Sequence, residues 1–156
     1  MAMEALHATI QEAKSKNLFK GVQQDRLPTR CDLDDREIYL DSTSFSFCEG
    51  DLETARHLFI ECPIVMDIWE NSRVWWDLDA YPKDLTNMLK WVDICNFNNQ
   101  VKGCLDVVVH METKVLWRYR NWLCFDAKPP RKDTLCDEIK VISHSLILPW
   151  NKKYYK

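Results

Sequence analysis

The chain has 156 residues, of which 46% are hydrophobic and 12% aromatic, with seven tryptophans and three glycines. This size and composition predict one folded domain with a sizeable core and exclude a disordered tail. The net charge of −3 is unevenly spread, because residues 32–79 hold thirteen acidic side chains and three basic ones, a charge of −10 that leaves +7 for the remainder. Phosphate contacts are therefore expected on the basic flanks.

Hydropathy and cysteine usage argue against a membrane-spanning, a secreted or a disulfide-bonded protein. No run approaches the ~18 to 20 apolar residues that span a bilayer, and the N-terminus lacks the apolar stretch of a secretory signal. We therefore expect an intracellular protein, in the nucleus or the cytoplasm, with no membrane partner. The odd count of seven cysteines favours core packing or metal ligation over disulfides, and four of them are expected to pack as small apolar side chains: Cys95, Cys104, Cys124 and Cys136.

The first part of the chain predicts two helices and an irregular segment. Apolar residues recur at helical spacing over residues 4–20, and Thr29 can cap a second, short helix. Phe45 and Phe47 then alternate with serines, which suits a short strand or a knuckle better than a helix.

Two helices are predicted to meet at a proline in the centre. The first should begin between Asp51 and Thr54 and end near Cys62, because Pro63 disfavours helical angles in the residue before it. Pro63 is itself favourable at the first position of the next helix. A further short helix is predicted over residues 81–94.

The C-terminal half holds the strongest periodicity. Residues 100–125 predict the longest helix, with an apolar stripe interrupted by Glu112. After a Pro-rich basic connection, a last helix is predicted to be capped by Asp133 or Thr134 and ended by Pro149. The fold class is therefore mainly α, a small helical domain with a short irregular hairpin like a zinc knuckle.

Three residues are spaced like ligands of a zinc site. Cys48, His57 and Cys62 are separated by eight and four residues, and gaps of this length allow a chain to wrap one metal ion. On an ideal helix His57 and Cys62 would not face one point, so the last turn must unwind at Cys62. Spacing alone leaves a second interpretation open, in which His57 lies at a helix surface and the cysteines pack in a core.

The string from Leu27 to Trp69 resembles a known family. It reads "LPTRCDLDDREIYLDSTSFSFCEGDLETARHLFIECPIVMDIW", and it is similar to the zinc-binding domain that follows the reverse transcriptase in plant non-LTR (LINE-type) retrotransposons. That family carries "LPT", a Cys-x-x-Cys knuckle and then "E-x-x-x-H-L-F-x-x-C" with a proline and a later tryptophan. The matching residues in the second half are Glu53, His57, Leu58, Phe59, Cys62, Pro63 and Trp69. Further on, "VLWRYRNWLCFD" resembles a segment that commonly trails the domain, with matches at Trp117, Arg120, Asn121 and Phe125.

The resemblance implies a zinc cofactor held by Cys48, His57 and Cys62. The sequence departs from the family at Phe45, which stands where the first knuckle cysteine is expected. A fourth donor is then expected from water, Cys31, Asp41 or Glu49; alternatively, the phenyl ring packs the hairpin onto the helix and replaces the metal by apolar burial.

No catalytic template fits the sequence. A Gly-rich phosphate loop, a Gly-x-Ser-x-Gly elbow and a His-Glu-x-x-His motif are all missing, and so is the Tyr-x-Asp-Asp signature of the parent polymerase. We therefore expect a non-catalytic chain without a small-molecule substrate. Its predicted parts are a lead-in over 1–26, a zinc-binding-like domain over 27–80 and a helical region with a basic tail over 81–156.

Basic and aromatic side chains alternate near the end of the longest predicted helix. Cations hold phosphates and aromatic faces stack bases, so this region is the candidate contact surface for RNA or DNA. Its basic residues are Lys114, Arg118, Arg120, Lys128, Arg131 and Lys132. Two alternatives stay open. In the first, the cationic groups only cover a buried aromatic stripe. In the second, the chain is a decayed remnant or a host protein-interaction module.

Overall fold

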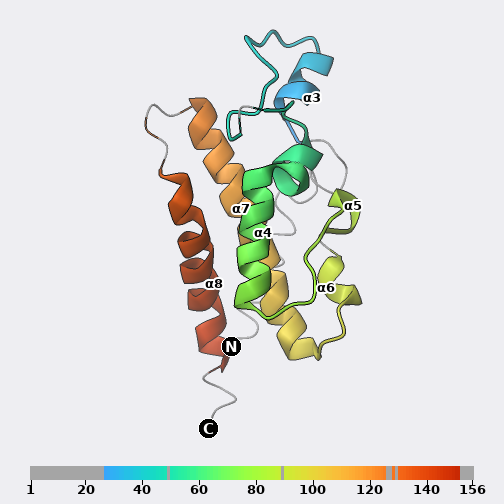
Figure 1. Ribbon diagram of the computed structural model, residues 1–156, viewed down its shortest axis with the longest axis vertical. Coiled ribbons are helices and arrows are strands. Elements are labelled where there is room, and N and C mark those ends of the chain that lie inside the picture. Colours follow the sequence, from blue (N-terminus) through green and yellow to red (C-terminus); the bar gives the residue numbers. More distant parts are fainter. Residues whose placement is uncertain (1–26, 49, 89, 126–127, 129, 152–156) are drawn as a thin grey trace.

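Three long helices carry the architecture. The computed structural model describes residues 27–48, 50–88, 90–125, 128 and 130–151. Within this part of the chain, α4 (Pro63–Trp75), α7 (Asn99–Phe125) and α8 (Leu135–Asn151) stand side by side, and α8 packs against both of the others (Figure 1). The mainly α class is confirmed, because β-structure in the described residues amounts to one isolated bridge between Ser44 and Leu52.

The longest helix forms where the periodicity predicted it. In α7 the predicted stripe is buried at Leu105, Val108, Val115 and Tyr119. Glu112, which interrupts that stripe, does not turn to solvent but is fully buried, where it accepts a hydrogen bond from the Ser72 hydroxyl of α4. Burial raises the pKa of Glu112 to about 8, and the Ser72 hydrogen bond acts in the opposite direction.

The last helix corrects one prediction. A 3₁₀ turn, Lys132–Thr134, leads directly into α8 at Leu135, and α8 continues to Asn151, so Pro149 does not end it. Pro149 lacks the backbone N–H that would donate within the helix, but only two helical residues follow it, so the loss is confined to one hydrogen bond near the end of α8.

The helix α4 begins at Pro63, as predicted, and buries Val65, Ile68 and Trp69. The Trp69 indole N–H donates to the Phe59 carbonyl across 2.8 Å, which ties α4 to the segment before it. The single helix expected over residues 81–94 is instead two one-turn helices, α5 (Leu85–Met88) and α6 (Trp91–Ile94).

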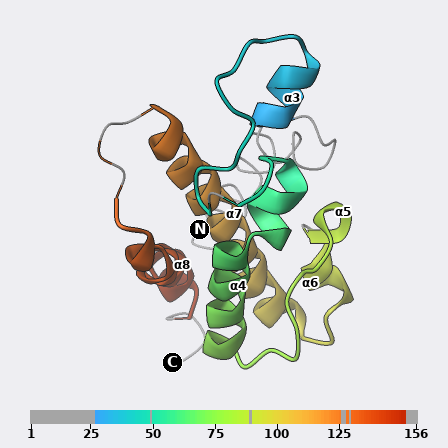
Figure 2. The same cartoon turned by 45° about the horizontal axis from the view of Figure 1, so that its top comes forward.

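The N-terminal part of the described chain contains α3 (Arg30–Asp35), capped by Thr29 as predicted. Beyond α3, a loop returns to the knuckle, which we define as residues 44–52; Figure 2 shows α3 and this loop beyond one end of the long helices. Of the strand or knuckle expected at Phe45 and Phe47, the structure forms a knuckle, and the two rings are buried in an irregular turn. The helix predicted over residues 4–20 lies outside the described residues.

One hydrophobic cluster connects the knuckle to the long helices. It includes Phe45 and Phe59 on one side and Leu105, Leu116 and Leu135 on the other. The predicted boundaries of the 1–26, 27–80 and 81–156 regions stay a prediction. Among the helices that the structure describes, none has both the length and the apolar character that crossing a bilayer requires.

Candidate metal centre

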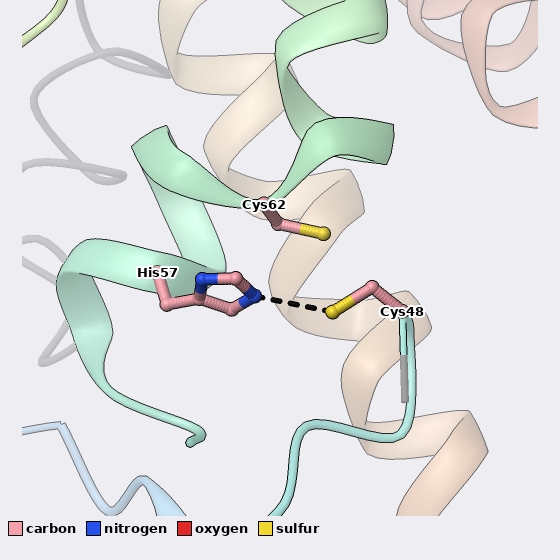
Figure 3. A group of neighbouring side chains, drawn as sticks. All are labelled: Cys48, His57 and Cys62. Carbon is pink, nitrogen blue, oxygen red and sulfur yellow. Dashed lines mark hydrogen bonds between the residues drawn. The ribbon is translucent and has the colours of Figure 1, made fainter. Parts of the chain in front are cut away.

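Three side chains with metal-binding atoms converge beside the knuckle. Cys48 comes from the knuckle, His57 from the turn before α4, and Cys62 from the residue just ahead of that helix (Figure 3). The Cys48 Sγ and His57 Nε2 atoms are 3.2 Å apart, and the ligand atoms of all three residues lie within 4.8 Å of one another. The structure thus brings the three predicted ligands together, which their spacing in the sequence alone had left undecided.

A widened helical turn aligns His57 with Cys62. Helical residues begin at Ala55, and His57–Glu61 forms a π-helical turn, in which the Cys62 N–H donates to the His57 carbonyl across 2.9 Å. A hydrogen bond from residue i+5 to residue i replaces the α-helical spacing and brings these two positions to one side. Cys62 then has extended angles, φ −61° and ψ 129°, as expected before Pro63.

Phe45, which the resemblance places where a first knuckle cysteine is expected, is a packing group in the structure. Its exposed fraction is 2%, and its ring meets His57 edge-on at 5.4 Å between centroids and stacks on Phe47 at 5.5 Å. Phe47 in turn contacts Tyr119 of α7 edge-on at 4.9 Å. The aromatic rings therefore attach the knuckle to α7 by apolar contact, and Phe45 offers no metal-binding atom.

Burial controls the protonation of Cys62. It raises the pKa of the Cys62 thiol to about 11, the neighbouring Cys48 acts in the same direction, and backbone N–H groups of Ile64 and Val65 oppose it. Without a metal the Cys62 thiol is therefore neutral, and metal binding must release its proton.

The donor set fits zinc, with three protein ligands. Zinc–sulfur and zinc–nitrogen bonds in a tetrahedron imply a sulfur–nitrogen separation of about 3.5 Å. The observed 3.2 Å between Cys48 and His57 requires only a small adjustment. Of the expected fourth donors, Cys31 and Asp41 do not join the cluster, and Glu49 lies outside the described residues. Asp51 is nearby, with its carboxylate 3.9 Å from His57 Nδ1.

The basic residues predicted to contact nucleic acid differ in their exposure to solvent. Lys114, Lys128 and Lys132 are exposed. Arg118 is partly exposed, pairs with Glu138 and lies 5.0 Å from the Trp122 ring, and exposed Arg131 pairs with Asp133. These five residues are at the surface or partly so.

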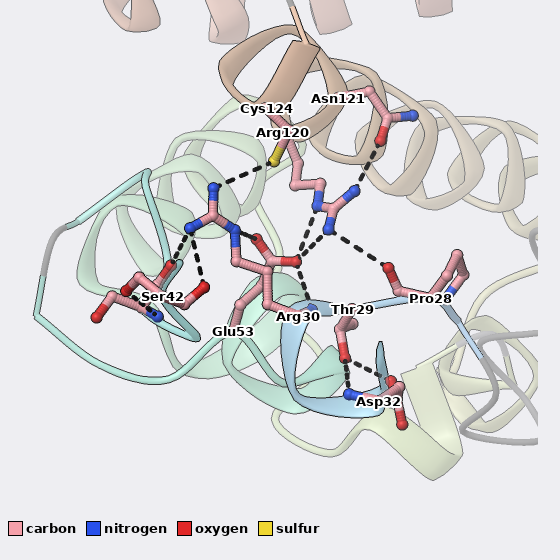
Figure 4. Close-up of polar contacts among 10 residues, drawn as sticks. Pro28, Thr29, Arg30, Asp32, Ser42, Glu53, Arg120, Asn121 and Cys124 are labelled. Atoms are coloured by element: carbon pink, nitrogen blue, oxygen red, sulfur yellow. Dashed lines mark hydrogen bonds and ion pairs between the residues drawn. The ribbon is translucent and has the colours of Figure 1, made fainter. Parts of the chain in front are cut away.

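Arg120 corrects the prediction, because it is buried in the interior. It donates to the Glu53 carboxylate through Nη2 and through Nε, the latter across 2.9 Å, and Nη2 also donates to the Pro28 carbonyl across 3.3 Å (Figure 4). Its side chain is 5% exposed and that of Glu53 is 0% exposed. Arg120 is thus unavailable to a phosphate and instead fixes the 27–80 region to α7.

The buried pair was missed by sequence reasoning although both residues carried a signal. Glu53 and Arg120 each match the family pattern, one in the zinc-binding motif and the other in the trailing segment. Glu53 also accepts the Arg30 backbone N–H at the start of α3 across 2.9 Å. A buried carboxylate needs such partners, so a required glutamate and a required arginine could have been paired.

Two thiols and an imidazole converging on one point in a helical scaffold are a donor set that could hold a metal ion. Residues 3–69 match the model of the family described as zinc-binding in reverse transcriptase, and all three donors lie in this range. The resemblance to a reverse transcriptase zinc-binding domain is thereby confirmed for this part of the chain. Comparisons with curated proteins and with solved structures gave no match.

Proposed function

We propose that this chain is a non-catalytic, zinc-stabilised module that assists RNA-directed DNA synthesis by a parent polymerase of the plant LINE type. The observation that carries the proposal is the convergence of Cys48, His57 and Cys62 within a segment that matches a reverse transcriptase zinc-binding family. Bound zinc would cross-link the knuckle to the start of α4. The module's contribution to the polymerase is then to hold template or target nucleic acid.

Metal content tests the first half of this proposal. Protein purified without chelators should contain zinc, and Cys48→Ser should lose it, because the thiolate is replaced by a poor zinc donor. Cys95→Ser is the matched control, since Cys95 is also half-buried but lies outside the cluster. Wild-type protein that holds no zinc and gains no thermal stability on zinc addition would exclude the metal role.

Binding to nucleic acid tests the second half. The candidate surface keeps five of its six predicted residues: Lys114, Arg118, Lys128, Arg131 and Lys132. Affinity for single-stranded RNA and for duplex DNA should fall steeply with salt, and for RNA the slope of log K against log salt should shrink by ~0.7 for each phosphate contact removed.

The matched variants for this experiment are lysines at the surface. Lys114→Gln and Lys132→Gln should weaken binding, whereas Lys83→Gln, which changes an exposed lysine outside the candidate surface, should not. Absence of affinity at low salt would refute the nucleic-acid role and favour the decayed remnant or host interaction module.

A further inference from the structure

A groove of about 830 Å³ adjoins the metal centre on the Cys48 side. The knuckle contributes Phe47 and Cys48 to its wall, and α4 and α7 contribute Ile64 and Tyr119. A water molecule takes up ~30 Å³ in the liquid, so the groove has room for a much larger ligand. The groove therefore gives the metal centre a side from which a ligand can approach.

The rim of this groove carries excess positive charge. Arg131, Lys132 and Asp133 line it, and the Arg131–Asp133 ion pair leaves Lys132 uncompensated among these three. Both cations are exposed, so the approach to Cys48 from this side favours a negatively charged ligand.

Access to the three donors is unequal. The exposed fractions of His57 and Cys62 are 6% and 0%, and neither lines the groove, whereas Cys48 is half-buried and does line it. Structural zinc takes four ligands, and the cluster found among the described residues supplies three of them. Cys48 is the one donor of the three that lines the groove, so a ligand from solvent can approach the metal past it.

We propose that a metal ion held by Cys48, His57 and Cys62 takes its fourth ligand from this groove, and that the ligand is a small anion drawn in by Arg131 and Lys132. The inference rests on the proposed metal site and adds a binding site for an exogenous ligand to it. With two thiolates and a neutral imidazole around a divalent ion, the centre itself has no net charge. Selection for an anion therefore depends on the charge of the rim, of which Lys132 is the part that the Arg131–Asp133 pair leaves uncompensated.

Cobalt(II) provides the test, because its visible absorption reports the number and kind of ligands. Metal-free protein is loaded with one equivalent of cobalt and titrated with thiocyanate, and separately with inorganic phosphate. The expected result is a saturable change in the visible bands of the wild-type protein. Lys132→Gln should weaken the anion's apparent affinity by roughly threefold at low salt, whereas Lys83→Gln, which changes an exposed lysine outside both the groove and the candidate nucleic-acid surface, should not.

A second variant is designed to fill the fourth ligand position with a side chain of the protein itself. Phe45→Cys supplies a fourth protein thiolate, so its cobalt spectrum should no longer respond to the anion, and its zinc affinity should exceed that of the wild-type protein. The wild-type titration stands by itself if this variant does not fold.

The outcomes separate the two proposals. Cobalt bound stoichiometrically with a spectrum insensitive to both anions overturns the groove ligand and leaves the metal site standing. Failure to bind cobalt or zinc overturns both proposals. An anion response that persists equally in Phe45→Cys also overturns the inference, because the anion then binds away from the metal.

Discussion

Removing one partner of the buried Glu53–Arg120 pair should strongly destabilise this protein, because the other charge is left unpaired in the interior. Arg120→Met keeps an apolar stem beside Trp117, over whose ring the guanidinium lies at 5.1 Å, and removes the charge. The Glu53 carboxylate, 0% exposed, would then keep the Arg30 N–H and a 3.8 Å approach of the Arg30 side chain. Removing one partner of a buried pair costs about 3–5 kcal/mol, so a urea m-value of ~2 kcal/mol/M predicts a midpoint lower by about 2 M.

Urea unfolding followed by tryptophan fluorescence measures this loss. Arg118→Met is the matched control two positions away, because the Arg118–Glu138 pair is 38% and 31% exposed and should contribute about 1 kcal/mol at most. Combining Glu53→Gln with Arg120→Met removes both charges and should recover part of the summed loss of the single variants. Equal destabilisation by Arg120→Met and Arg118→Met would refute the reasoning.

Three further predictions concern the core and the metal. The pKa of Glu112 is about 8 in the folded state and about 4.3 in the unfolded state. Between these pH values the folded protein holds one proton more than the unfolded chain. The free energy of unfolding therefore falls by about 1.4 kcal/mol for each unit that the pH rises. Urea unfolding at pH 5, 6.5 and 8 should therefore show a shallower decline for Glu112→Gln, and equal slopes would contradict the buried carboxyl. Trp69→Phe should lower the free energy of unfolding by about 1–3 kcal/mol, because it leaves the Phe59 carbonyl without its donor. In the same assay, the control Trp75→Phe at a partly exposed position should lower it by less than about 0.5 kcal/mol. Adding a chelator to zinc-loaded protein should lower its melting temperature and leave that of Cys48→Ser unchanged; the same shift in both would remove the cluster as its cause.

Local sequence signals predicted the elements that depend on neighbouring residues. Thr29 caps α3 and Pro63 begins α4, because capping and proline geometry act within one helical turn. The length of α7 followed from its apolar period. The same reasoning failed at Pro149, since the helix continues for two residues beyond it.

Other features depended on contacts between distant segments. Periodicity made Glu112 an interruption of an apolar stripe, and only the position of α4 gave it Ser72 as a partner. Arg120 stands among basic and aromatic residues that suit nucleic acid, yet its partner is Glu53, which lies 67 positions earlier. Sequence reasoning records the type of a side chain but not which face of a helix another segment will cover.

By itself, the sequence determined the three candidate metal ligands and the reverse transcriptase zinc-binding family that they resemble. Tertiary structure decided that the ligands meet, because a π-helical turn and an extended Cys62 place His57 and Cys62 on one side, facing Cys48. It also decided that Arg120 holds the fold together and that a groove reaches Cys48. The physical reason is that ligand identity is a property of single residues, whereas convergence and burial arise only when distant segments pack.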